Sequence, residues 1–409
     1  MKFKQMDRRL ITILLIVFVQ MLGASMAVPI LPLFAQRHFA MEPQFIAFLV
    51  SSFFIAQFLA GPTIGRMSDK YGRIPVLIVS QIGTAISFVM LGGAQSAAML
   101  FAARILDGIT GGNIIAAQAY VIDITPREKR TQALGYIFAA FGLGFIFGPA
   151  LGGILSSSFG ERAPFYMAAV AATIVVILTW FTLDESLTAE QRQANRLSRR
   201  AKFSPREVMA NTPLMLVLLI AFVGQFGLGM IQATLALYGE AVLFKGYTPE
   251  ATSLGIGLLY TNVGIAQFAT QSFILPRMLR RYNEAWLVIV GNLSRALGLL
   301  LFAVIVTPWP AAIAIILFAM GMGLVMPPLQ SLATSTVGDE VRGGALGLFQ
   351  SATSLSVIMS TAVAGFIFNL HPAYPYWIGS LLSFLVTIPA VFLWRQSQAK
   401  AEKLPASAD

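Results

Sequence analysis

Two residues of opposite charge lie close together in a long apolar stretch. The segment RILDGITGGNIIAAQ begins at Arg104 and carries Asp107 three positions later. Residues three apart on a helix share a face, so these side chains can pair. An ion pair inside a bilayer is costly and usually marks the path of an ion or a substrate. We predict that Asp107 takes up and releases a coupling proton and that Arg104 tunes this binding. The alternative is a permanent structural pair that holds the helix against a neighbour.

Uncharged polar and aromatic side chains interrupt several other apolar stretches. Interhelical hydrogen bonds account for most such polar residues. Apolar walls with sparse polar groups also suit a bulky amphipathic ligand. The residues that we expect at a substrate cavity are Gln20, Gln118, Tyr136, Phe141, Phe145, Gln225, Phe226, Gln232, Gln330 and Gln350. Arg295 lies in the middle of a further stretch, where it could attract an anionic substrate, bond backbone carbonyls or reach toward lipid headgroups.

The elements that position these residues must be membrane-spanning helices. The 409-residue chain is 57% hydrophobic and 11% charged, whereas soluble domains are about 25% charged. Its mean hydropathy is +0.75. It has no cysteine and two histidines, which excludes disulfides, thiolate metal sites and a histidine-rich metal site. We therefore expect an all-α integral membrane protein without a cofactor.

The apolar stretches predict twelve transmembrane helices. A spanning helix needs about 20 mostly apolar residues. The expected spans are 10–35, 44–65, 74–94, 97–122, 131–155, 164–183, 213–238, 252–274, 286–306, 310–335, 344–369 and 374–394. With a cytoplasmic N-terminus, 23 of the 28 Lys and Arg residues fall on the cytoplasmic side. This asymmetry follows the positive-inside rule. It places both termini in the cytoplasm and explains the net charge of +10 without a nucleic-acid partner.

Internal similarity predicts two pseudo-symmetric six-helix bundles. Residues 55–71 read IAQFLAGPTIGRMSDKY and residues 265–282 read IAQFATQSFILPRMLRRY. Other short matches occur in the same order in both halves, which a duplication explains. The expected division is an N-terminal bundle at 1–183, a basic cytoplasmic linker at 184–212, a C-terminal bundle at 213–396 and a tail at 397–409. Repeated bundles with a site between them are a transporter design.

A charged loop follows the second expected span. It reads GRMSDKYGRIPVL, with Gly65, Asp69, Gly72 and Arg73 at fixed spacing. This loop resembles the signature loop of the major facilitator superfamily. The resemblance implies that Asp69 faces the start of the eleventh helix, near Arg342, and that Arg73 pairs with Asp123. The loop would then latch the outward-open state by closing the cytoplasmic side. The ninth helix is peripheral in that superfamily, which favours a structural role for Arg295.

The fifth expected span is rich in glycine. It carries Gly135, Gly144, Gly148–Pro149 and Gly152–Gly153. Residues 144, 148 and 152 repeat every four positions and form one stripe, which lets helix backbones approach closely in lipid. The spacing resembles the fifth-helix pattern of drug-exporting antiporters. It implies a helix kinked at Pro149 where the halves meet; the alternative is an ordinary tight helix pair.

The stretch from Gly65 to Glu185 is similar to the proton-coupled tetracycline efflux pumps and their drug-exporting relatives. Their first helix carries an acid nine residues before a Pro-x-x-Pro segment, and here that position is Gln20. From the similarity to these pumps as a whole, we expect a monomeric antiporter of the bacterial inner membrane. It would export drugs or amphipathic molecules by alternating access, powered by a proton gradient. A facilitator or symporter for a small metabolite is the alternative. The sequence contains no catalytic constellation, so we do not expect an enzyme.

Overall fold

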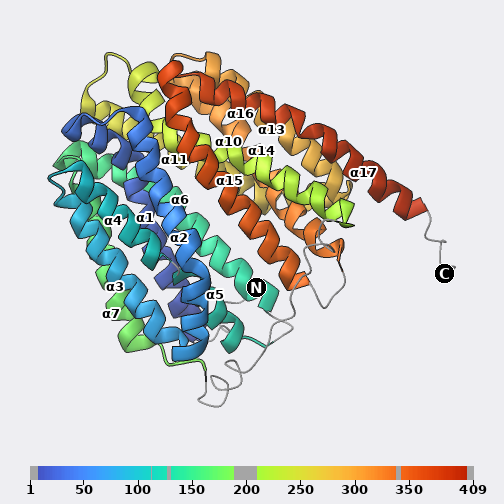
Figure 1. Ribbon diagram of the computed structural model, residues 1–409, viewed down its shortest axis with the longest axis horizontal. Coiled ribbons are helices and arrows are strands. Elements are labelled where there is room, and N and C mark those ends of the chain that lie inside the picture. Colours follow the sequence, from blue (N-terminus) through green and yellow to red (C-terminus); the bar gives the residue numbers. More distant parts are fainter. Residues whose placement is uncertain (1–7, 112, 127–129, 188–209, 338–341, 403–409) are drawn as a thin grey trace. The chain divides into compact units, whose positions relative to one another are not determined.

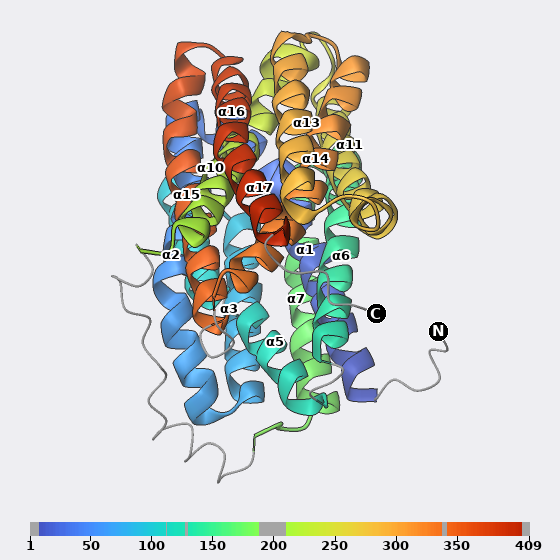
Figure 2. The same cartoon turned by 90° about the vertical axis from the view of Figure 1, so that its right-hand side faces the viewer.

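The computed structural model describes residues 8–111, 113–126, 130–187, 210–337 and 342–402. Helices form all regular secondary structure in these ranges, and no strand occurs in them (Figure 1). The long helices run side by side, as both views show for each unit (Figure 2). The prediction of an all-α integral membrane protein is therefore confirmed.

Two compact units divide the chain. The first contains Met1–Arg199, Leu235–Glu240 and Phe244–Gly264. The second contains Arg200–Thr234, Ala241–Leu243 and Ile265–Asp409. The segment 244–264 thus packs with the first unit, although it follows the linker in sequence.

The first helices of the first unit follow the order of the expected spans, although the fourth expected span is divided between two short helices. Their bounds are α1 (Arg8–Phe39), α2 (Pro43–Tyr71), α3 (Arg73–Gly92), α4 (Ala97–Thr110), α5 (Asn113–Ile124), α6 (Arg130–Phe159) and α7 (Ala163–Thr182). An apolar core between α1, α3, α5, α6 and α7 includes Ile13, Leu77, Tyr120, Ile137 and Val175. Burial of these side chains stabilises this part of the unit.

The later helices also match the expected spans. They are α10 (Thr212–Tyr238), the π-helix η3 (Gly239–Leu243), α11 (Pro249–Ala269), η4 (Thr270–Ile274), α12 (Leu275–Leu279), α13 (Glu284–Val304), α14 (Pro308–Ser335), α15 (Arg342–Leu370), α16 (Tyr374–Leu385) and α17 (Thr387–Glu402). Leu214, Val288, Leu329, Phe349 and Ala390 contribute to the apolar core of the second unit.

Ten helices in the described ranges are long and apolar enough to cross a membrane. The fourth and eighth expected spans are not among them. The fourth is divided into α4 and α5, which are each short, and the eighth corresponds to α11 with η4. The division follows Gly111, where the helical hydrogen-bond ladder stops. Gln57 of α2 donates its side-chain amide to the Gly111 carbonyl at 3.2 Å, which satisfies a group that the break exposes.

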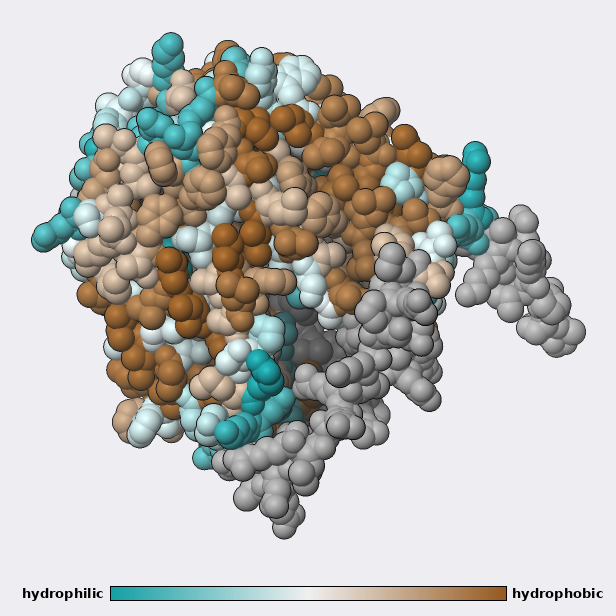
Figure 3. All heavy atoms as spheres, viewed as in Figure 1, coloured by the Kyte–Doolittle hydropathy of each residue, from teal (hydrophilic) through white to brown (hydrophobic). Residues whose placement is uncertain are grey.

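The outer surface of the helices is apolar. Large side chains such as Leu59, Val79, Trp180, Trp309 and Phe392 are more than half exposed. Hydrophobic residues, coloured brown, cover much of the face seen in Figure 3, and strongly hydrophilic residues, coloured teal, lie mostly near its margins. A surface of this kind suits contact with lipid chains. The protein is therefore a multipass membrane protein.

Candidate functional site

The structure pairs Arg104 with Asp107 inside the first unit. Nη1 of Arg104 lies 2.9 Å from Oδ2 of Asp107, and only 13% and 9% of the two side chains is exposed. The guanidinium lies over the ring of Phe53 in α2, 4.3 Å from its centroid. Thr84 and Ser87 of α3 border the carboxylate. The pair is therefore enclosed by α2, α3 and α4.

Small residues allow α4 to approach its neighbours so closely. A Cβ atom at Gly108 would collide with the Phe53 carbonyl of α2, and one at Gly83 of α3 would collide with Thr110. Close packing excludes water and strengthens the electrostatic attraction within the pair. A proton on Asp107 would leave Arg104 without its counter-charge, which is unfavourable at a buried site.

A second cluster of charges surrounds Arg73 at the start of α3. Its Nη1 lies 2.7 Å from Oδ1 of Asp69, and its Nε lies 2.9 Å from Oδ2 of Asp123 at the end of α5. Nη1 also donates to the hydroxyl of Ser68 at 3.1 Å. Gly72 adopts a φ of +111°, a conformation that favours glycine. This sharp turn joins α2 to α3 and aims Arg73 at both acids.

Glu185, which follows the C-terminal end of α7 in the sequence, completes this cluster. Its Oε1 accepts the backbone N–H of Arg73 at 2.9 Å, and its Oε2 accepts that of Ile74 at 3.2 Å. The carboxylate thus caps the N-terminus of α3, where negative charge is stabilising. The hydroxyl of Ser186 donates to Oδ2 of Asp123 at 3.0 Å. We name Asp69, Arg73, Asp123, Glu185 and Ser186 the gate cluster.

Sequence reasoning did not assign a role to Glu185. A signal existed, because Gly72 stands at the N-cap of α3 and has no side chain with which to cap it. Gly65 and Arg342 are also predicted at this site. Gly65 has no neighbouring atom where a Cβ would lie. Arg342 opens α15, but its side chain lies outside the described part of the chain.

The glycines of α6 face two different partners. Cβ atoms at Gly144, Gly148 and Gly152 would each collide with α1, and the hydroxyl of Ser25 donates to the Gly144 carbonyl at 2.9 Å. This stripe is the contact surface of a tight helix pair, α1 and α6, within the first unit. Gly153 instead faces α11 in the same unit, where its Cβ would lie 3.1 Å from the Leu254 Cα.

Two more of the α6 residues differ from the stripe. The Pro149 carbonyl would lie 2.5 Å from a Cβ at Gly257, so this part of α6 also approaches α11. Gly135 has open space beside it. The three positions predicted to form one stripe therefore share α1 as their partner, whereas Gly153 and Pro149 approach α11 and Gly135 has open space beside it.

An ion cluster that the sequence did not predict lies at the C-terminal end of α1. Arg37 pairs with Glu161 and with Glu240, whose Oε1 is 2.7 Å from the arginine Nε. His38 Nε2 lies 3.2 Å from the second Glu161 oxygen. Nη1 of Arg37 also donates to the Ser253 hydroxyl at 3.3 Å. Arg37 lies in the last turn of α1, and the acids that it meets are distant in sequence.

Arg295 is fully buried in the second unit. Its Nη2 donates to the Gly224 carbonyl of α10, and its guanidinium lies 5.8 Å from the ring centroid of Phe318 in α14. The structure therefore agrees with the expectation that Arg295 bonds a backbone carbonyl. Its Nε and Nη1 atoms have no hydrogen-bond partner within the described ranges.

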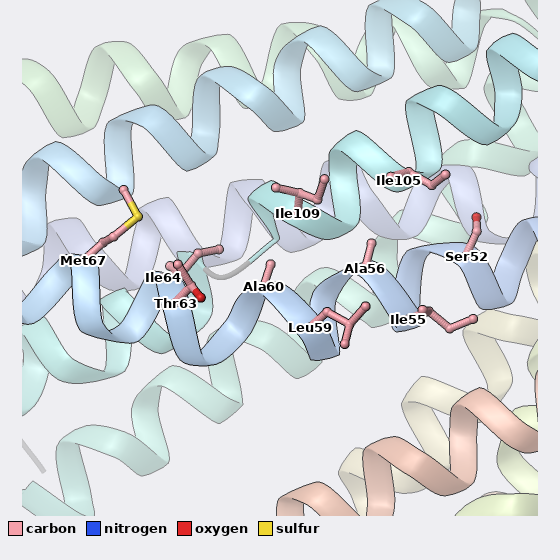
Figure 4. A pocket seen from close by; sticks show the side chains of 10 residues that line it. All are labelled: Ser52, Ile55, Ala56, Leu59, Ala60, Thr63, Ile64, Met67, Ile105 and Ile109. Atoms are coloured by element: carbon pink, nitrogen blue, oxygen red, sulfur yellow. The ribbon is translucent and has the colours of Figure 1, made fainter.

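The residues expected at a substrate cavity are spread over α1, α5, α6, α10, α14 and α15. Gln330 and Gln350 are exposed, and the other members are partly buried. A separate apolar groove of about 680 Å³ lies between α2 and α4 (Figure 4). Its lining residues are Ser52, Ile55, Ala56, Leu59, Ala60, Thr63, Ile64, Met67, Ile105 and Ile109. None of the expected cavity residues lines this groove.

The buried ion pair, the charge cluster around Arg73 and the lipid-facing helices are features expected of a membrane transport protein. The family model of the Major Facilitator Superfamily matches residues 13–254 and 242–408, and the chain belongs to this superfamily. It is 30% identical over 391 residues to the tetracycline resistance protein, class C, of Escherichia coli, which covers 94% of this chain and 96% of that protein.

Two further comparisons agree with the assignment. Multidrug resistance protein 2 of Bacillus subtilis (strain 168) is 26% identical over 392 residues, with 95% of each protein covered. The crystal structure of a D-xylose-proton symporter has the same fold, with a TM-score of 0.75 at 16% identity over 94% of this chain and 97% of that one. The fold thus consists of two six-helix halves, and the protein is a transporter of small molecules.

Proposed function

We propose that the protein is a secondary active transporter that exports drugs or other amphipathic small molecules in exchange for protons. The observation that carries the proposal is the buried Arg104–Asp107 pair in a chain of this superfamily. The names of the relatives, which are tetracycline and multidrug resistance proteins, support drugs as the substrate class. We place the protein in the bacterial inner membrane as a monomer with both termini in the cytoplasm.

The proton would be carried by the Asp107 carboxylate. While Asp107 is ionised, it compensates the charge of Arg104 at 2.9 Å. Protonation removes that compensation, so the protonated site favours a conformation in which Arg104 meets water or another acceptor. A proton gradient can then shift the population between two states, because the proton binds them with different affinity. This linkage gives alternating access a source of free energy.

The gate cluster would stabilise one of these states. Arg73 bridges the end of α2 and the end of α5 through Asp69 and Asp123. A movement that separates these helix ends must break at least one of the two ion pairs. We infer that the cluster forms when the cytoplasmic side is closed, so Asp69→Ala should lower turnover without abolishing substrate binding. Loss of binding in a folded Asp69→Ala protein would contradict this role.

The decisive experiment uses purified protein in liposomes with an imposed pH gradient. Lumenal pH is followed while tetracycline, a cationic dye, a lipophilic anion and a sugar are added in turn. We expect the gradient to collapse with one class of amphipathic compound and to persist with the sugar. Asp107→Asn should retain substrate binding but lose the proton flux, since the amide cannot take up a proton.

A matched control separates proton binding from simple damage to the ion pair. Thr110→Val alters a neighbouring residue of α4 whose hydroxyl bonds only backbone carbonyls of its own helix, at 2.8 and 3.4 Å, and should leave proton exchange intact. Saturable flux without proton movement, equal in wild type and Asp107→Asn, would instead identify a facilitator. Arg104 and Asp107 would then be a structural pair.

A further inference from the structure

Arg295 carries a charge that no described carboxylate compensates. It lies near the middle of α13 with 0% of its surface exposed. The one carboxylate side chain that the structure describes in the second unit is Glu284. That residue begins α13, about 16 Å away along the helix axis at about 1.5 Å per residue. Arginine stays protonated in proteins, so the positive charge persists.

The packing is shaped to hold the guanidinium in this place. A Cβ atom at Gly224 would lie 2.6 Å from Nη1 of Arg295, and one at Gly321 of α14 would collide with the arginine Cγ. Glycine at both positions therefore makes the room for the side chain. The Gly224 carbonyl and the Phe318 ring fix its direction.

The surroundings solvate the charge without neutralising it. Asn292, one turn earlier on α13, is fully buried, and both of its amide atoms lack a partner in the described ranges. Ser383 of α16 is buried as well. Both the Ser383 hydroxyl and Nη2 of Arg295 lie within 4 Å of the Cβ position of Gly227. These neutral dipoles can stabilise a cation, but they leave its net charge unchanged.

Charges buried in the first unit cancel one another, since Arg104 is paired with Asp107. The described interior of the membrane-spanning helices therefore carries one net positive charge, which Arg295 supplies. The guanidinium lies against α10 at Gly224. Gln225 and Phe226, next along α10, are residues expected to contact substrate. A ligand on the far side of that helix would be about 10 Å away, the diameter of a helix.

We propose that Arg295 sets the charge preference of the transporter and favours anionic or neutral amphipathic substrates over lipophilic cations. This inference rests on the proposed function, because it concerns the substrates of the same export site. At an effective dielectric constant of about 20, one charge at about 10 Å changes the affinity for a monovalent ligand about tenfold. An anion gains this factor and a cation loses it.

The test compares two xanthene dyes of similar size and opposite charge, fluorescein and rhodamine 123. Dissociation constants are measured by fluorescence polarisation with purified full-length protein in nanodiscs, without a pH gradient or a membrane potential. The wild type should bind fluorescein more tightly. In Arg295→Met the ratio of the two constants should move toward the cation by at least tenfold, whereas Arg295→Lys should keep the wild-type ratio within about threefold.

A second variant keeps the arginine and adds the missing negative charge. Asn292→Asp places a carboxylate one helical turn from Arg295, so it should shift the ratio in the same direction as Arg295→Met even if that variant fails to fold. Tighter binding of rhodamine 123 by the wild type, or one ratio in all folded variants, would overturn the inference. If neither dye bound the wild type, both this inference and export of amphipathic drugs would be overturned.

Proton antiport is measured separately in the liposome experiment. A charge-dependent ratio without proton flux would leave the inference standing and would refute the coupling alone. Proton flux with an unchanged ratio would do the reverse. The two ideas therefore fail through different results.

Discussion

Replacing Glu185 should loosen the start of α3 and with it the gate cluster. The carboxylate accepts the N–H groups of Arg73 and Ile74 at 2.9 and 3.2 Å, and neither N–H has another acceptor among the hydrogen bonds of the described residues. A hydrogen bond to a charged group contributes about 1.5–3 kcal/mol, and the loss of a helix cap typically costs about 1 kcal/mol. We therefore expect Glu185→Ala to favour local opening by about 2 kcal/mol, which is about thirtyfold in population.

Hydrogen–deuterium exchange of the peptide that contains Arg73 and Ile74 measures this opening directly. Its slowest amides should exchange about thirtyfold faster in Glu185→Ala than in the wild type. Glu185→Gln keeps an oxygen acceptor but loses the charge, so its effect should be intermediate. Turnover in liposomes should change together with exchange, since Arg73 would be less well positioned for Asp123.

The neighbouring Asp184 offers a matched control. Its carboxylate pairs with Arg9 at 3.1 Å, but 81% of its side chain is exposed, and such surface pairs contribute little. Asp184→Asn should leave exchange at Arg73 and Ile74 unchanged. Equal exchange in wild type, Glu185→Ala and Asp184→Asn would refute the idea that Glu185 holds the start of α3.

Three other substitutions test the packing. Gly148→Ala should lower the unfolding temperature, because its Cβ would collide with α1 at a typical cost of about 1–3 kcal/mol. Gly135→Ala, with open space beside it, should be neutral or slightly stabilising. Equal effects of the two substitutions would contradict the role of the stripe in packing. Gly72→Ala should destabilise the loop by more than about 1 kcal/mol, because the new side chain would have to adopt a φ of +111° and would collide with the Glu185 carboxylate. We expect faster hydrogen–deuterium exchange at the start of α3. Exchange at the wild-type rate would contradict this prediction. Arg37→Gln should leave Glu161 without its arginine partner and lower the thermal stability measured in detergent. The matched change Arg66→Gln, at an exposed site, should lower it less. Equal losses of thermal stability would show that the ion cluster around Arg37 contributes nothing to stability.

The helix map was readable from the sequence because lipid imposes a simple requirement. Each span must be long and apolar, so bounds such as Arg73–Gly92 and Glu284–Val304 lie within two residues of the expected ranges. The interruption after Gly111 was not predicted, since a pair of glycines inside an apolar run is compatible with both a continuous and a broken helix. The bond from Gln57 shows how the fold tolerates the break.

Helical periodicity predicts the part of the site whose residues are close in sequence, and the family resemblance implies the contact of Arg73 with Asp123, which are 50 residues apart and 2.9 Å from each other in the structure. Arg104 and Asp107 are one turn apart, so helical periodicity alone places them together. Glu185 is 112 residues from Arg73, and no sequence pattern identifies Glu185 as the partner of the uncapped helix start. The same holds for Arg37, whose acidic partners come from elements that meet it only through tertiary packing.

The distance in sequence between Glu185 and Arg73 has a consequence for synthesis. The cap of α3 is a residue that leaves the ribosome 112 residues later. At about 5–20 residues per second, the start of α3 waits roughly 6 to 22 seconds for its cap. During that interval the turn between α2 and α3 has the bonds of Arg73 to Asp69 and Ser68 but lacks the cap on the N–H groups of Arg73 and Ile74. A chain arrested before residue 184 should therefore show fast exchange at Arg73, and one arrested well beyond Ser186 should show slow exchange. The same slow exchange in both arrested chains would exclude this order of assembly.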